Sequence, residues 1–168
     1  MQNAKDTFYT TLQARIAALN PGRTIIVRGT VRPGVLVDEN ELPALSPPVD
    51  CFRLRWTKLE VAEASPLPLA AMTCAITYAT DGTSGNAAMD RGRLLSAMDA
   101  ELAAALIQTP RCAPKLNYSA AGVGVAPAVM GTNIFWADPV FGAVTTSDER
   151  LERTATVQVF DYQEAGEL

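Results

Sequence analysis

Two segments in the middle of the chain alternate apolar and polar residues, and this alternation constrains the fold more than any other sequence feature. The apolar positions are Phe52, Leu54 and Trp56 in residues 51–61 and Met72, Cys74, Ile76 and Tyr78 in residues 71–80. A period of two is typical of strands with one buried face. The short proline-containing turn between them predicts an antiparallel pair. The alternation slips by one residue near Lys58, which predicts a bulge or a strong bend.

Two other segments have the apolar spacing of amphipathic helices. In the first, Phe8, Leu12, Ile16 and Leu19 share a face; Asp6 is the expected N-cap, and Asn20-Pro21-Gly22 ends the helix. In the second, Asp90 is the expected N-cap, and Thr109-Pro110 ends a stripe formed by Leu94, Leu95, Met98, Leu102, Ala105 and Leu106. We expect both helices to pack on the sheet; the sparsely charged outer face of the first leaves open a contact with a partner.

The remaining segments complete a single α+β domain over residues 1–168. Short strands are predicted at residues 24–28, 35–37, 133–137 and 154–162, with an acidic loop at 38–48 and a polar connection at 145–153. Residues 110–131 are rich in Pro, Gly and Ala and lack a clear period, so we expect a long loop that serves as an arm or lid. The order of elements predicts an antiparallel or mixed sheet with an N-terminal helix and one long central helix on one face.

Charge and composition exclude several classes of function. The 168 residues include 14 Lys and Arg against 18 Asp and Glu, a net charge of −4, and no histidine. A negative chain is a poor binder of nucleic acid, and without imidazole the commonest general base and metal ligand are missing. The three cysteines lack zinc-site spacing and are expected to be reduced, buried thiols. We expect neither a signal peptide, because Lys5, Asp6 and Arg15 interrupt the N-terminal segment, nor a membrane span.

No sequence motif for catalysis or cofactor binding is convincing. The glycines Gly122 and Gly124 lack the third glycine of a dinucleotide fingerprint, no phosphate-binding loop occurs, and the carboxylates Asp38, Glu39 and Glu41 lack calcium-loop spacing. We therefore predict no catalytic residue, no cofactor and no metal site. Two alternatives stay open: an enzyme that works through carboxylates alone, such as Asp38 or Glu41 beside Asp90, and a cytoplasmic ligand-binding domain with residues 110–131 as its lid.

Charged residues in unfavourable or outward positions are the candidates for an interaction surface. They are Arg53 and Arg55 on a strand, Arg91 and Arg93 at the positive end of a helix, and Asp148, Glu149, Arg150 and Arg153 in the last hairpin. Such arginines suit the carboxylates of a neighbouring subunit. The alternative is that Arg91 and Arg93 pair with Asp99 within the chain or stay in water, and the same choice applies to Arg53 and Arg55.

The order of elements resembles one family. The N-terminal helix with its NPG stop, the sheet-forming centre, the central helix MDRGRLLSAMDAELAAAL and the final strand ATVQVFDY are similar in layout to the tail terminator, or tail-completion, proteins of tailed bacteriophages, over about residues 6–162. The resemblance implies a structural virion protein rather than an enzyme. It carries no family motif that assigns individual residues, and the long loops at 80–88 and 111–131 also fit another neck or connector protein.

The same resemblance implies partners and a location. Such proteins form a homo-oligomeric ring, commonly a hexamer, that caps the tail tube, stops its polymerisation and provides the attachment surface for the head. The expected partners are therefore copies of this chain, the tail tube protein and neck or connector proteins, with DNA only as cargo in the channel. The expected location is the tail or neck of the virion, after assembly in the host cytoplasm.

Overall fold

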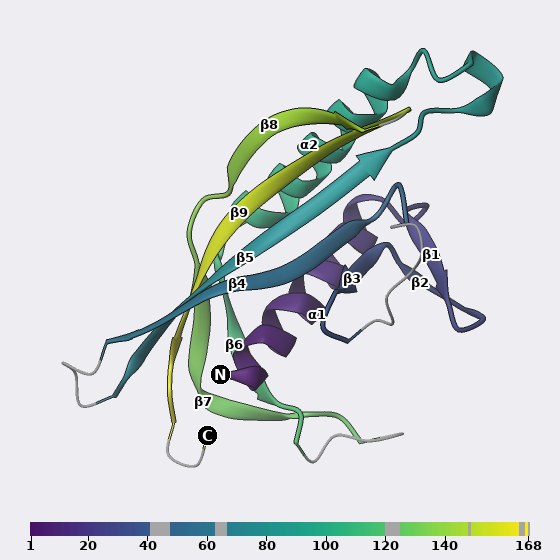
Figure 1. Ribbon diagram of the computed structural model, residues 1–168. Helices are drawn as coiled ribbons and strands as arrows, with labels where there is room; N and C mark the ends of the chain where they lie inside the picture. The colour runs from purple at the N-terminus through teal and green to yellow at the C-terminus, as the bar shows by residue number, and fades with distance from the viewer. Residues whose placement is uncertain (41–47, 63–66, 120–124, 148, 165–166, 168) are drawn as a thin grey trace.

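The computed structural model describes residues 1–40, 48–62, 67–119, 125–147, 149–164 and 167. It is an α+β fold in which a curled sheet wraps around two helices (Figure 1). The elements in chain order are α1 (Gln2–Leu19), β1 (Thr24–Val27), β2 (Thr30–Pro33), β3 (Val35–Val37), β4 (Phe52–Ala62), β5 (Leu69–Thr80), the short 3₁₀ helix η1 (Ser84–Asn86), α2 (Arg91–Ile107), β6 (Cys112–Asn117), β7 (Ala128–Trp136), β8 (Val140–Ser147) and β9 (Arg150–Tyr162).

The main sheet is built on the antiparallel β4–β5 pair that the alternating residues predict. Its order is β3-β4-β5-β9-β7-β6, and β8 also pairs with β9. All of its pairs are antiparallel except β3–β4, so the sheet is mixed. The register of β4 against β5 shifts between Trp56 and Lys58, which confirms the predicted irregularity. Because β4 bends there, its last residues leave the body of the fold.

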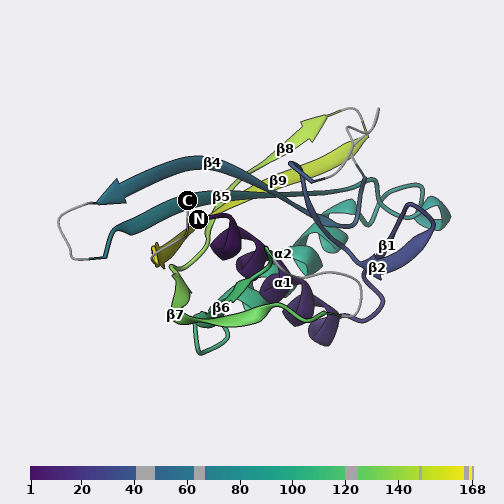
Figure 2. The same ribbon diagram turned by 90° about the horizontal axis from the view of Figure 1, so that it is seen from below.

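The strand β9 joins the β4–β5 pair to the other strands of the sheet, because its two edges pair with different strands. One edge of β9 pairs with β5 from Leu151 to Tyr162. The other edge pairs first with β8, from Arg150 to Thr156, and then with β7, from Val159 to Asp161. β7 and β6 curl away from the plane of β4 and β5 and close one end of the fold around α1 (Figure 2).

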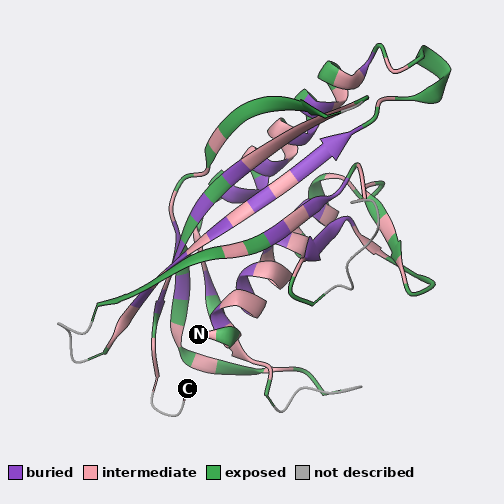
Figure 3. Ribbon diagram, viewed as in Figure 1, coloured by how far each residue is buried: buried purple, intermediate pink, exposed green. Residues whose placement is uncertain are grey.

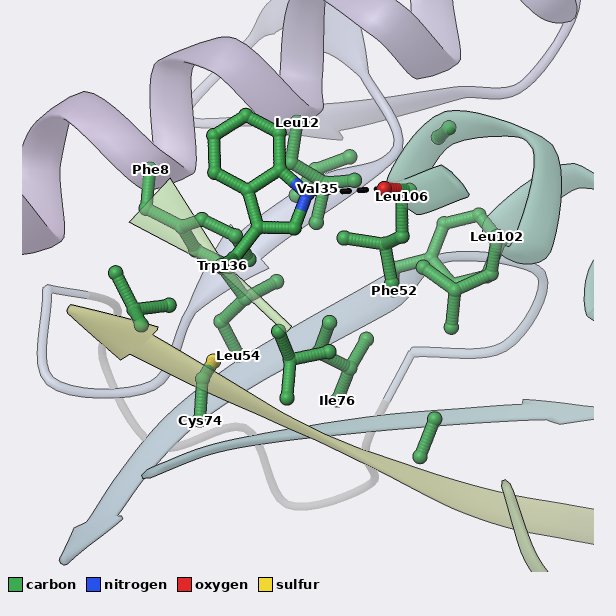
Figure 4. Packing of buried hydrophobic residues seen from close by; sticks show 14 of the residues in the cluster. Phe8, Leu12, Val35, Phe52, Leu54, Cys74, Ile76, Leu102, Leu106 and Trp136 are labelled. Carbon is green, nitrogen blue, oxygen red and sulfur yellow. Dashed lines mark hydrogen bonds between the residues drawn. The ribbon is translucent and has the colours of Figure 1, made fainter. Parts of the chain in front are cut away.

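The core lies between the concave face of the sheet and the two helices. α1 contributes Phe8, Leu12 and Ile16, and α2 contributes Leu102 and Leu106, all almost fully buried (Figure 4). The rings of Phe8 and Trp136 meet edge to face with centroids 5.7 Å apart. The indole Nε1 of Trp136 donates to the carbonyl oxygen of Leu106 over 2.9 Å, so the polar atom of this buried ring is satisfied.

The prediction of a loop over residues 110–131 is wrong for much of that segment. Cys112–Asn117 forms β6, and β7 begins at Ala128. β6 contains Pro114, which has no backbone N–H to donate. β6 is an edge strand, where that donor is not needed, and its register against β7 shifts between Pro114 and Leu116. Part of the region, residues 120–124, lies outside the described residues.

Other local predictions also need correction. α1 begins at Gln2, so Asp6 lies inside the helix and accepts a hydrogen bond from Gln2 rather than acting as the N-cap. Asp90 does occupy the N-cap position of α2, but its carboxylate accepts from the backbone N–H and hydroxyl of Thr83, at 2.9 and 2.8 Å, and from no helix amide. Residues 145–147, expected in a polar connection, belong to β8.

Candidate functional site

The arginine candidates from α2 and the last hairpin meet at one end of the sheet. The β8–β9 turn lies beside the first turn of α2, so the guanidinium of Arg91 donates to the backbone carbonyl of Glu149. Arg91 Nε also donates to the carbonyl of Ala88 over 3.0 Å. Sequence reasoning thus selected residues that do gather in space, although Asp148 lies outside the described residues.

Most charges at this end are paired within the chain. Arg153 Nη1 lies 2.6 Å from Asp99 Oδ2, and the hydroxyl of Tyr78 donates to Asp99 Oδ1 over 2.5 Å. Burial, followed by this hydrogen bond to an anion, raises the pKa of Tyr78, which stays protonated. Arg150 Nε lies 2.9 Å from Asp81 Oδ1. These contacts fasten α2 and the β8–β9 turn to the sheet, a structural role.

The three remaining arginine candidates differ in whether their guanidinium groups have a partner within the chain. Arg53 Nη2 lies 2.9 Å from Asp38 Oδ1, so this guanidinium is also paired. Arg55 on β4 and Arg93 on α2 are exposed, and their guanidinium groups form no ion pair or hydrogen bond with another described residue. They stay available for an external contact, but they project from different elements and form no common site.

The more distinctive surfaces are two hairpins that the charge analysis missed. In the β1–β2 hairpin, Ile26 and Val31 are directly paired across the strands and are 69% and 63% exposed. At the other side of the molecule, the β4–β5 tip, by which we mean the described residues Leu59–Ala62 and Leu67–Leu69, exposes Leu59 and Val61 by 49% and 41%. Figure 3 shows both regions as largely exposed, and Figures 1 and 2 agree that they lie at opposite sides of the molecule.

The β1–β2 hairpin follows from a local sequence signal. Two short β-branched runs flank Arg28-Gly29, and these two residues adopt φ values of 50° and 79°. Positive φ at both central positions is the backbone of a tight two-residue hairpin turn, for which glycine is favoured. The signal was present in the sequence, which predicted one strand at 24–28. The exposure of Ile26 and Val31 could not be predicted, because the hairpin forms its own two-stranded sheet outside the main one.

The chemistry of the other groups is limited. Burial raises the pKa of Cys51 to about 11 and that of Cys74 further, so both thiols are protonated at neutral pH and are poor nucleophiles.

A shallow cleft of about 120 Å³ between α1 and β4 is lined by Lys5, Asp6 and Glu39 among others. Within the described part of the chain, no cluster of three or more Asp, Glu or Cys side chains is arranged to hold a metal ion, and no helix is long and apolar enough to cross a membrane.

Comparison with known proteins adds no assignment. No model of a known protein family matches the chain, and no curated protein matches its sequence.

Proposed function

We propose that this chain is a structural subunit of a tailed bacteriophage, of the tail terminator type. Copies of the chain form a ring, most simply a hexamer, that caps the tail tube, stops its polymerisation and offers a surface to the head or to neck proteins. In this role the chain is not an enzyme and needs no cofactor. Its place is the tail or neck of the virion, assembled in the host cytoplasm.

The observation that carries the proposal is the pair of exposed apolar hairpins on opposite sides of one subunit. A two-fold dimer uses the same patch on both copies, whereas a ring needs two different patches that face away from each other. The β1–β2 hairpin and the β4–β5 tip are such a pair, since they differ in sequence and lie at opposite sides of the subunit. Side chains such as Ile26 and Leu59 gain free energy when a neighbour covers them.

Termination then requires geometry and no bond-making chemistry. One face of the ring matches the last ring of the tube, and the opposite face cannot start another ring. The net charge of −4 per copy suits a channel through which DNA passes without being held, because like charges repel the phosphates. Another neck or connector protein of the phage would share this design, and binding to the tail tube separates the two roles.

The cleft beside α1 gives little support to a ligand-binding domain. Its volume of about 120 Å³ is well below the roughly 300–1,000 Å³ of pockets for small organic ligands. The carboxylates of the enzyme alternative are also not assembled as expected. Asp38 pairs with Arg53, Asp90 accepts from Thr83, and Glu41 lies outside the described residues.

The test measures assembly first and tube binding second. Light scattering on a sizing column, at several concentrations and with electron microscopy of each peak, is expected to reveal rings of about six 17.9 kDa copies. Sedimentation with purified tail tubes is then expected to place the protein at tube ends. Phage that lack the protein are expected to make overlong or headless tails. Normal infectious particles without it would eliminate the proposal.

A further inference from the structure

The two hairpins carry opposite charges as well as apolar side chains. Residues 21–37 contain three arginines and no Asp or Glu, and residues 59–68 contain two glutamates and no Lys or Arg. Arg23 forms an ion pair with Glu101 within the subunit, whereas Arg28 is exposed in the β1–β2 turn. Glu60 is exposed on the β4–β5 tip. Each hairpin therefore presents one apolar pair next to charge of one sign, and the charge on one hairpin is opposite to the charge on the other.

The β4–β5 tip also has an unused strand edge. β3 pairs with β4 only from Phe52 to Leu54, and among the described residues the part of β4 from Lys58 to Ala62 pairs with β5 alone. Its outer edge presents unpaired backbone groups. Because side chains alternate along a strand, Leu59 and Val61 lie on one face of the ribbon and Glu60 lies on the other, and a strand added along this edge carries side chains to both faces. Among the residues that the structure describes, the β1–β2 hairpin also pairs with no further strand, since it forms a two-stranded sheet of its own. A two-stranded hairpin is marginally stable alone and gains from a partner.

We propose that the β1–β2 hairpin of one copy docks along the free β4 edge of the β4–β5 tip of the next copy. Ile26 and Val31 cover Leu59 and Val61, and Arg28 pairs with Glu60. The partner is a second copy of this chain because the chain supplies both complementary halves. This inference rests on the proposed ring and names the contact that would build it: a head-to-tail contact that closes when the subunits follow a rotation.

One charge inside the subunit competes with this pairing. Lys58 Nζ lies 2.8 Å from Glu60 Oε1, with both side chains about 60% exposed. An exposed ion pair of this kind contributes little free energy because water solvates both partners. A carboxylate has two oxygens and accepts several hydrogen bonds, so Glu60 can keep Lys58 and accept Arg28 from the neighbouring copy.

The test is a charge exchange in the full-length chain. R28E and E60R each place like charges across the contact, and each is expected to weaken self-association at least tenfold. An equimolar mixture of the two variants restores opposite charges at every contact of an alternating ring, so association is expected to recover. A97E and A97R are matched controls, because Ala97 is exposed on α2, outside both hairpins, and is not one of the interface candidates; they are expected to leave assembly unchanged. Circular dichroism checks that every variant is folded.

The outcomes separate this contact from the proposed function. A ring that is insensitive to R28E and E60R, or a mixture that fails to recover, would overturn the hairpin contact and leave the ring proposal standing. If the wild-type chain is monomeric in solution but binds tube ends, the same variants are compared for tube-end binding, and binding that is insensitive to R28E and E60R would overturn the contact. Hairpin-dependent rings that bind no tail tube would support the contact and overturn the terminator function.

Discussion

Lys115 Nζ lies 2.8 Å from Asp161 Oδ1, and neither side chain is exposed to solvent. Lys115 projects from the edge strand β6 and reaches past β7 to β9. Its ammonium also donates to the carbonyl of Tyr162 over 2.6 Å and to Glu167 Oε2 over 2.5 Å. All three of its N–H donors thus have acceptors, and the contact ties the curled end of the sheet to the last residues of the chain.

Replacement of Lys115 by methionine is expected to destabilise the fold strongly. K115M leaves the Asp161 carboxylate buried without a cation, at a cost of about 3–5 kcal/mol in the free energy of unfolding. The double variant K115M/D161L removes both charges and is expected to recover at least half of that loss. Urea denaturation of the three proteins measures the difference. A single variant as stable as the wild type would show that the pair is unimportant.

Stability is expected to depend on pH through Glu101, which links α2 to the end of α1. Burial alone would raise the pKa of Glu101, but hydrogen bonds from Arg23 and Asn20 and the charge of Arg23 outweigh it and lower that pKa below its ordinary 4.5. A lowered carboxyl pKa stabilises the fold above pH 4.5 and loses this effect as the pH falls through the folded-state value. E101Q is therefore expected to be less stable than wild type by about 1–3 kcal/mol at pH 7, with the gap closing below pH 4.5. A gap that is constant from pH 7 to pH 3 would contradict this assignment.

The packing of α2 on the sheet makes Leu102 a sensitive position. L102D places a charge in the fully buried core and is expected to abolish folding, as monitored by far-ultraviolet circular dichroism and solubility. A100D, on the exposed side of the same helix, is the matched control and is expected to cost less than about 1 kcal/mol. A soluble, folded L102D protein would rule out the core position.

Two glycines with the same backbone conformation are expected to differ in tolerance to alanine. Gly82 and Gly29 both have a φ of +79°, so alanine is strained at either site by about 1–2 kcal/mol. At Gly82 a Cβ would also lie 2.8 Å from the Cα of Ala88, whereas nothing lies within 4 Å at Gly29. G82A is therefore expected to lower the midpoint of thermal unfolding more than G29A does. Equal midpoints would show that the turn before α2 relaxes freely.

The candidate surface was only partly predictable, for a physical reason. Arg91 and Arg153 were selected from the sequence because of their unfavourable or outward positions, but the structure pairs Arg91 with backbone carbonyls and Arg153 with Asp99. Ion-pair partners such as Asp99 and Arg153 are 54 residues apart, and no local pattern encodes such a distance. The hairpin signal at Arg28-Gly29 was local and therefore readable, whereas the exposure of Ile26 depends on where the hairpin lies relative to the sheet.

The periodic elements can be predicted from local sequence: the alternating strands β4 and β5, the bulge near Lys58, and the apolar faces of α1 and α2. These follow from side-chain periods of 2 and 3.6 residues, which any single segment carries. Local sequence does not predict that β9 pairs with β5, β8 and β7, that Pro114 lies on an edge strand, or that Lys115 contacts Asp161. Those features depend on which elements pack side by side, and this is settled by burial over the whole chain rather than by local spacing.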